Sequence, residues 1–262
     1  MSSIKLKDRI SSYSEVNDYK LLNRVPIIIC INGRGFSRLS SLLDKPYSNQ
    51  LSECMFATLL KLCSEVDGTV FGYHFNDELV LIVKNDQSLD TRPWYDNRLQ
   101  KICSVTASIA TLHFNNCAAA LDLNLIGDPT FLSNVFTVPS ISEAVNLIVS
   151  KQQHNFHSSI QFACFYEMLN KKYDKPTIKE MLSGLSVDEK IDLLKQECDI
   201  DFNNYAVDFR RGVAAYKVPQ VIDGAIKNKW MLNTELPIFT QDHSFIFSIL
   251  KNGTDILRDN NL

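Results

Sequence analysis

Two adjacent carboxylates, Asp77 and Glu78, are the side chains of this sequence best suited to hold a metal ion. They lie in the stretch HFNDE, between two apolar runs over residues 69–73 and 78–83 that are typical of a β-hairpin. Carboxylate oxygens at neighbouring strand ends bind hard divalent cations, and a pair of such ions promotes attack on a phosphate. Side chains alternate along a strand, so only one of the two carboxylates can face a given ion. The competing interpretation is an ordinary turn, with Asp77 as a turn residue and Glu78 in solvent.

A glycine-containing loop after an apolar strand is the second candidate site. The stretch IIICINGRGFSRL indicates a strand over residues 25–31, buried on both faces, that runs into a tight turn with Asn32 at the hinge. The backbone N–H groups from Gly33 to Gly35 would form a nest for a phosphate. Glycines at strand ends are also found in plain turns, so this alternative stays open.

Arg98 and Lys101 form a basic pair that is the third candidate. They are three residues apart, so a helix over residues 98–114 places both on one face. A guanidinium and an ammonium there would bind a triphosphate, whereas as isolated charges they would be solvated surface.

The elements that must position these residues follow an α+β order. Helical spacing covers residues 2–22, 51–66, 98–114 and 142–170, and two short helices capped by Thr177 and by Ser186 follow within residues 175–198. Strand patterns cover residues 25–31, 69–73, 78–83, 134–138 and 207–218, with 229–231 as a partner for the last. We therefore expect one α+β domain.

Composition narrows the function classes. The 262 residues are 45% hydrophobic and 22% charged, which is ordinary for a globular protein. A net charge of −3 gives no overall basic field, so nucleic-acid binding would need a local patch. Arg210 with Arg211, and Lys171, Lys172 and Lys175, are the best candidates.

Cysteine usage and hydropathy predict a compartment. The seven cysteines are scattered without a CxxC pair, which favours reduced, buried thiols and no zinc site. We see no secretory signal and no apolar run of the ~18 residues that a membrane span needs. The expectation is an intracellular, most simply cytoplasmic, protein without membrane contact.

Five motifs in one order resemble those of the tRNA-His guanylyltransferases and, more closely, their Thg1-like relatives. The motifs are GRGF, YHFNDE, NRLQKICSVTAS, FRRG and WMLNTELPIF, and the resemblance runs nearly end to end. It implies a polymerase-palm-like (ferredoxin-like) antiparallel sheet with packed helices and a helical C-terminal appendage. Residues 1–140 would form the nucleotide-binding palm and residues 141–262 a helical and β portion packed on it as one unit. The implied activity is 3′-to-5′ addition of nucleotides to tRNA 5′ ends.

The same resemblance implies roles for individual residues. Asp77 and Glu78 would be catalytic, and Asp77, Gly33 and Asn32 would hold the metal. The implied nucleotide-binding residues are Gly33, Arg34, Gly35, Phe36, Ser37, Asn76, Arg98 and Lys101. The expected RNA-binding residues are Lys151, Gln152 and Ser159, with Arg210 and Arg211 added for their charge. The implied cofactors are Mg²⁺ and an NTP, either GTP or ATP.

The chain departs from the family pattern where the metal would be held. The aspartate that follows the first strand in relatives is Asn32 here, and a Phe-Asp-x-Arg-x-Phe motif has become FLSNVF, with Leu132 and Asn134 at the charged positions. Ser37 replaces a histidine that lies against the nucleotide base in the family. Losing one negative charge ~4 Å from a cation costs several kcal/mol at an effective dielectric of ~20.

Two hypotheses follow. In the first, the chain is an active, divergent nucleotidyltransferase that acts on tRNA or a tRNA-like RNA with reduced two-metal chemistry. In the second, it is a catalytically inactive paralogue that binds RNA or nucleotide, or serves as a structural subunit. The resemblance implies a homo-oligomer (tetramer or dimer), or a hetero-oligomer with an active paralogue.

Overall fold

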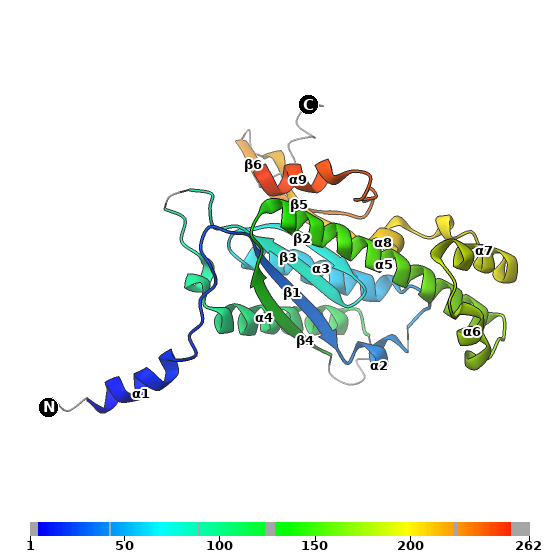
Figure 1. The fold of residues 1–262 in the computed structure, drawn as a ribbon, viewed down its shortest axis with the longest axis horizontal. Helices are drawn as coiled ribbons and strands as arrows, with labels where there is room; N and C mark the ends of the chain where they lie inside the picture. Colours follow the sequence, from blue (N-terminus) through cyan, green and yellow to red (C-terminus); the bar gives the residue numbers. More distant parts are fainter. Residues whose placement is uncertain (1–4, 42, 89, 124–128, 223–224, 253–262) are drawn as a thin grey trace.

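The computed structural model describes residues 5–41, 43–88, 90–123, 129–222 and 225–252 (Figure 1). Within them, antiparallel strands form one six-stranded sheet in the order β4-β1-β3-β2-β5-β6. The strands are β1 (Ile27–Arg34), β2 (Thr69–Phe75), β3 (Glu78–Val83), β4 (Thr130–Thr137), β5 (Val213–Ile222) and β6 (Ala225–Asn233). This antiparallel sheet with packed helices confirms the predicted fold class.

Helices cover both faces of the sheet (Figure 1). On one face lie α3 (Asn49–Glu65) and α4 (Leu99–Ala120), and on the other lie α5 (Ile141–Asn170) and α9 (His243–Asn252). The apolar run of β1 explains this sandwich, because Ile27, Ile29 and Ile31 face one helical layer while alternate residues face the other.

A helical extension follows α5 and has a core of its own. It contains α6 (Lys175–Leu182), α7 (Val187–Cys198), η2 (Phe202–Asn204) and α8 (Val207–Arg211). Ser186 caps α7 in a capping box with Glu189, as predicted. The cap of α6 is Asp174 rather than Thr177, because the Thr177 N–H donates to the Asp174 carboxylate.

Several predicted boundaries were wrong. β1 continues past residue 31 to Arg34, and residues 207–211 are helical rather than extended. The helical prediction for residues 142–170 is confirmed by the single helix α5. The N-terminal helix α1 (Leu6–Glu15) is shorter than the predicted 2–22, of which residues 2–4 lie outside the described part. The remaining elements are α2 (Phe36–Ser40) and η1 (Trp94–Asn97).

β5 lies beside β2 and extends the sheet, although it comes from beyond residue 140. The division into a palm over 1–140 and a packed portion over 141–262 remains a proposal.

Among the described residues, no helix is both long and apolar enough to cross a membrane.

Candidate functional site

Four of the predicted site residues, Asn32, Gly33, Asp77 and Glu78, meet at one end of the sheet, where β1 ends and β2 turns into β3. Gly33 and Asp77 are joined there by a hydrogen bond of 2.8 Å from the Gly33 N–H to the Asp77 carbonyl oxygen. A Cβ atom on Gly33 would lie 2.4 Å from the Phe36 ring and 2.9 Å from the Asp77 Cβ. The strand therefore requires glycine at this position, because Phe36 and Asp77 pack directly against its backbone.

This pairing corrects the predicted phosphate nest. Gly33 and Arg34 are still part of β1, and the Gly33 N–H is already used by Asp77, so it cannot bind a phosphate. The chain turns at Gly35, which has a left-handed backbone conformation (φ of 87°) and is the N-cap residue of the short helix α2. Phe36 and Ser37 form the first turn of that helix. Phe36 is buried against Phe114 and anchors the turn to α4.

The two carboxylates point to opposite faces of the sheet. Asp77 lies beside Gly33 and Phe36, on the face covered by α3 and α4. Glu78 accepts a hydrogen bond from the ammonium of Lys151 on α5, at 2.5 Å between Oε1 and Nζ. The Glu78 and Lys151 side chains are only 19% and 30% exposed. Glu78 thus already has a cationic partner that comes from within the chain.

The substituted positions are neighbours across three strands. In the register of the sheet, Asn32 pairs with Glu78 on one side and with Leu132 on the other. Asn32 is exposed, and Leu132 is 60% exposed. Aspartates at 32 and 132, the residues that the resemblance implies for these positions, would stand side by side next to Glu78. In this chain both positions are neutral, so Glu78 is the one carboxylate in the row.

Asp77 lines a cavity of about 330 Å³ between this sheet end and α5. The other lining residues are Phe36, Leu43, Asp44, Lys45, Pro46, Ser48, Leu51, Asn76, Phe162 and Tyr166. The Lys45 ammonium lies over the Tyr166 ring, 5.2 Å from its centroid. Burial lowers the pKa of Lys45 from its ordinary value and raises that of Asp77, with the Glu78 charge adding to the latter.

Lys45, Phe162 and Tyr166 were missed from the sequence. Lys45 is a single lysine in the loop SSLLDKPYS, with no spacing that links it to Asp77. The two aromatic residues lie four apart on α5, which by itself indicates only a helix face. Only the approach of α5 to the β2–β3 turn places them in the cavity.

The basic pair Arg98 and Lys101 is not part of this cluster. Phe114 of α4 touches Phe36 at the site end, with ring centroids 4.9 Å apart. Lys101 precedes Phe114 by 13 residues on the same helix, which corresponds to about 20 Å at 1.5 Å per residue. Arg98 pairs with Asp18 at 3.2 Å, at the opposite end of the sheet. Within one copy of the chain, neither can contact a phosphate held at Asp77.

Two of the expected RNA-binding residues lie in the interior. Gln152 is buried; its amide donates to the carbonyl oxygens of Arg211 and Pro237 and accepts from the Phe239 N–H. Ser159 is also buried and donates to a carbonyl of its own helix. These bonds assign both side chains to packing, which corrects the expectation of RNA contact.

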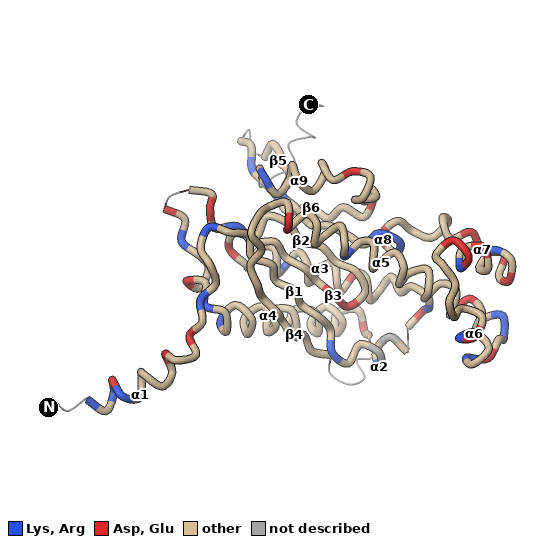
Figure 2. The backbone as a smooth tube through the Cα atoms, viewed as in Figure 1, with Lys and Arg blue, Asp and Glu red and all other residues tan. Residues whose placement is uncertain are grey.

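Arg210 and Arg211 are only partly available for RNA. The Arg210 guanidinium donates to the carbonyl of Tyr205, and that of Arg211 donates to the carbonyl of Leu236. Helix α7 mixes acidic and basic residues, whereas α6 carries Lys175 and Lys179 four residues apart with one acidic residue, Glu180 (Figure 2).

The donor set does not fit two divalent cations. Among the described residues, no group of three His, Cys, Asp or Glu side chains comes together. Two carboxylates line the cavity, Asp77 and Asp44, and neither makes an ion pair within the described ranges. Glu78 is paired with Lys151, and position 32 holds a neutral amide. One carboxylate with phosphate oxygens suffices for a single Mg²⁺, an ion that commonly keeps several waters.

Comparison with known proteins identifies the fold and the family. A family model described as tRNAHis guanylyltransferase (Thg1) matches residues 7–139, just over half of the chain. Among solved structures, a bacterial Thg1-like protein in complex with ATP aligns with a TM-score of 0.81 and 26% identity, covering 94% of this chain and 99% of that one. The Saccharomyces cerevisiae enzyme aligns with a TM-score of 0.69 at 18% identity and supports the fold alone.

Curated relatives belong to the same family. The Dictyostelium discoideum protein, a probable tRNA(His) guanylyltransferase, is 24% identical over 218 residues, which cover 80% of this chain and 83% of the relative. Arabidopsis thaliana tRNA(His) guanylyltransferase 1 is 24% identical over 229 residues, and there the match spans only 39% of the plant protein. The chain is a member of the tRNAHis guanylyltransferase (Thg1) family.

Proposed function

We propose that the chain binds one nucleoside triphosphate at the Asp77 cavity with a single Mg²⁺, and adds the nucleotide to the 5′ end of a tRNA-like RNA at a reduced rate. The observation that carries this proposal is the convergence of the Asp77 carboxylate and the Lys45 ammonium on one cavity. A carboxylate suits the cation and an ammonium suits phosphate oxygens, so the pair matches a metal–triphosphate ligand. Solved structures of a bacterial Thg1-like protein in complex with ATP and with GTP align with this chain, which supports an NTP as the ligand.

Each residue then has a defined task. Asp77 would hold Mg²⁺ together with the triphosphate, and the Gly33 carbonyl is a further neutral oxygen donor at the same strand end. The Asn32 side chain lies in the row of Glu78, on the other face of the sheet, and would reach the ion only through a bound water. Lys45 would bind phosphate oxygens, which Arg98 and Lys101 cannot reach within one copy. The bound Mg²⁺ would supply charge neutralisation for the leaving phosphate. The side chains of Phe36, Phe162 and Tyr166 would exclude water from the nucleotide.

The second candidate function is a catalytically inactive subunit that binds nucleotide or RNA. The row Leu132–Asn32–Glu78 favours it, because two of its three positions are neutral where the resemblance implies carboxylates, and Glu78 is bonded to Lys151. Such a copy would act within a homo-oligomer or beside an active paralogue, as the family resemblance implies.

An extension assay separates the two functions. The full-length chain is incubated with MgCl₂, labelled GTP or ATP, and a tRNA that carries a 5′-triphosphate and lacks its first nucleotide. Slow extension that disappears in Asp77→Asn and Lys45→Gln, and persists in the matched control Lys101→Gln, supports the enzyme. If wild type and these three variants do not extend the RNA, whereas Asn32→Asp does, the result supports the inactive subunit.

Nucleotide binding tests the part that both functions share. Titration calorimetry with GTP and MgCl₂ should show one site, which Asp77→Asn weakens at least tenfold and Lys101→Gln leaves unchanged. Equal affinity for wild type and Asp77→Asn would refute the assignment of the cavity.

A further inference from the structure

The loop over residues 43–48 carries Lys45 to the Asp77 cavity but has little regular structure of its own. It lies between α2 and α3 and contains neither helix nor strand. Within the described ranges, residues 43–47 make no backbone hydrogen bond. Lysine has a flexible aliphatic stem, so a lysine on such a loop is not held in one place by its own backbone. The position of the Lys45 ammonium therefore depends on side-chain contacts of the loop.

Tyr47, two residues after Lys45, attaches the loop to the helical extension. Its hydroxyl donates a hydrogen bond of 2.5 Å to the Asp208 carboxylate of α8. Its ring packs edge-on against that of Phe209, with centroids 5.5 Å apart, and so joins the apolar core of the extension. Burial, and then the bond to Asp208, raise the pKa of the Tyr47 hydroxyl above its ordinary value, so the hydroxyl stays protonated and donates at neutral pH.

Helix α8 is a firm anchor for that bond. Phe209 is buried in the core of the extension, and its N–H donates to the second carboxylate oxygen of Asp208. The carbonyl oxygen of Arg211 accepts a hydrogen bond of 2.8 Å from the Tyr73 hydroxyl of β2, and the Arg211 guanidinium donates to the carbonyl of Leu236. A chain of contacts thus runs from the central sheet through α8 to the loop.

The remaining contacts of the loop are weaker. The Lys45 ammonium lies 5.2 Å from the centroid of the Tyr166 ring, an interaction worth about 0.5–1 kcal/mol at a partly exposed site. A cavity of about 70 Å³, lined by Pro46, Tyr47 and Asp208 among others, lies beside the loop, so close packing does not fix it. Without the Tyr47–Asp208 bond the loop could shift into that space, and Lys45 would move with it.

We propose that Tyr47 is a positioning residue for Lys45. Its bond to Asp208 fixes the loop so that the Lys45 ammonium faces the Asp77 cavity and meets the phosphates of the bound nucleotide. The helical extension is in this way part of the nucleotide site, although no described residue of α6, α7 or α8 lines that cavity. The inference rests on the proposed function, because it needs a nucleoside triphosphate at this cavity.

The first test is the affinity for GTP with MgCl₂, by titration calorimetry of the full-length chain. Tyr47→Phe keeps the ring and removes the hydroxyl, so it should weaken GTP binding about five- to tenfold, the effect of one lost hydrogen bond. Asp208→Asn keeps an acceptor oxygen and should stay within about twofold of wild type. Tyr205→Phe is the matched control, since it removes a hydroxyl that donates to Glu167 within the same extension, in a bond that does not involve the loop. Its affinity should equal that of wild type.

A double-mutant cycle shows whether Tyr47 acts through Lys45. Lys45→Gln removes the charge at the cavity, so adding Tyr47→Phe to it should weaken GTP binding no further. Additive losses would mean that Tyr47 supports the site in general, and would overturn the proposal. A Tyr47→Phe affinity equal to that of wild type, or an equal loss in Tyr205→Phe, would also overturn it.

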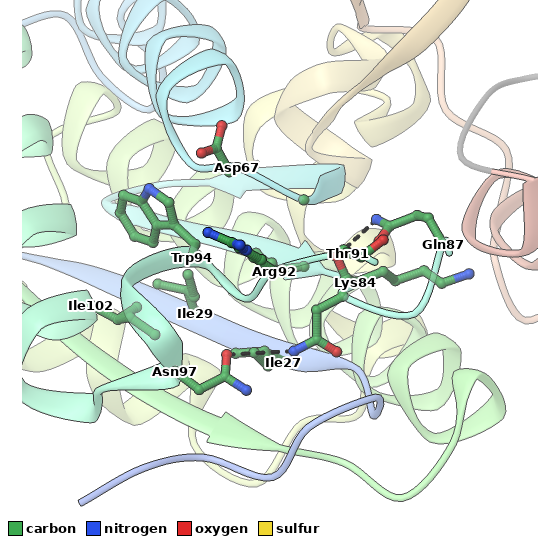
Figure 3. Close-up of a pocket in the computed structure, with 13 residues that line it drawn as sticks. Ile27, Ile29, Asp67, Lys84, Gln87, Thr91, Arg92, Trp94, Asn97 and Ile102 are labelled. Atoms are coloured by element: carbon green, nitrogen blue, oxygen red, sulfur yellow. Dashed lines mark hydrogen bonds between the residues drawn. The ribbon is translucent and has the colours of Figure 1, made fainter. Parts of the chain in front are cut away.

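A second cavity separates failure of this inference from failure of the proposed function. It has a volume of about 360 Å³ and lies at the opposite end of the sheet, with an apolar floor from β1 and α4 beside Trp94 and Arg92 (Figure 3). Arg92 makes no ion pair within the described ranges, so Arg92→Gln removes a lining cation without breaking a pair.

The affinity for GTP should fall in Lys45→Gln and stay unchanged in Arg92→Gln. A loss in Arg92→Gln alone, or no GTP binding by wild type, would refute the proposed function and this inference with it. GTP binding that depends on Lys45 but is the same in wild type and Tyr47→Phe would refute the positioning role and leave the nucleotide site in place.

Discussion

Replacing Asn32 with Asp tests how the charge balance of the site works. The new carboxylate would stand directly across from Glu78, because the two residues are register partners in β1 and β3. Without a divalent cation, the carboxylates at positions 32 and 78 would repel each other, and the Lys151 ammonium that is paired with Glu78 would offset only part of their charge. The variant should therefore be less stable than wild type in EDTA and should become dependent on metal for its stability.

The size of the effect follows from the geometry. Side chains directly across an antiparallel pair lie about 5 Å apart. Two unit charges at that distance repel by about 0.8 kcal/mol in a water-like dielectric and by about 3 kcal/mol at an effective value of 20. Because Lys151 screens the pair, we expect a loss of about 1–2 kcal/mol. For a chain of this length that lowers Tm by about 2–8 °C.

The assay is thermal unfolding with EDTA and with MnCl₂ or MgCl₂. A cation at one hundred times its Kd stabilises by about 2.7 kcal/mol, so saturating metal should raise the Tm of Asn32→Asp above its value in EDTA by more than it raises that of wild type. Asn134→Asp is the matched control: it makes the same change at an exposed residue of the edge strand β4, opposite Cys30 rather than Glu78. The Tm of Asn134→Asp should equal that of wild type both in EDTA and with metal.

Two results would contradict this reasoning. If Asn32→Asp is as stable as wild type in EDTA, position 32 does not feel the charge of Glu78. If the metal raises the Tm of Asn32→Asp and of Asn134→Asp by the same amount, the cation binds to the added surface charge and not to the strand end that holds Asp77.

Three further predictions concern packing and protonation. Gly33→Ala should cost about 1–3 kcal/mol in urea unfolding and weaken GTP binding, since its Cβ would lie 2.4 Å from the Phe36 ring. Burial lowers the pKa of His74 to about 4, so the unfolded chain takes up a proton below pH ~6.5 that the folded chain does not. Stability should fall by up to about 3 kcal/mol as the pH drops from 6.5 to 4, and His74→Gln should flatten that slope. Gln152→Ala should lower the free energy of unfolding by about 2–4 kcal/mol, because buried backbone groups would lose their hydrogen-bond partner. The RNA affinity of the folded protein should not change. A loss of RNA affinity without a loss of stability would contradict the structural role.

Local patterns in the sequence predicted most elements because their causes are local. The β-branched run before Asn32 produced a strand buried on both faces, and Ser186 with Glu189 produced a capping box. Errors came where a neighbour in space decided the outcome. β1 continues through Gly33 because β4 and the β2–β3 turn pair with it, and those partners are distant in sequence.

The candidate site divides in the same way. Asp77, Glu78, Asn32 and Gly33 were found from residue type and motif order, together with the departure from the family pattern. Lys45 was not, because a lone lysine in a loop carries no periodic signal, and it acquires meaning only where the loop meets α5. Arg98 and Lys101 were grouped with the site by motif order, yet α4 carries them to the other end of the sheet.

The sequence by itself determined the family and the α+β class and drew attention to the neutral Asn32, since these depend on residue identity and short spacing. Only the tertiary structure decided what surrounds that residue. Strand register places Leu132, Asn32 and Glu78 in one row, and the pleat directs Asp77 and Glu78 to opposite faces. Helix α5 then brings Lys151 to Glu78, so that of these two adjacent carboxylates only Asp77 lines the cavity. Such relations depend on contacts between residues far apart in the chain, and no local pattern encodes them.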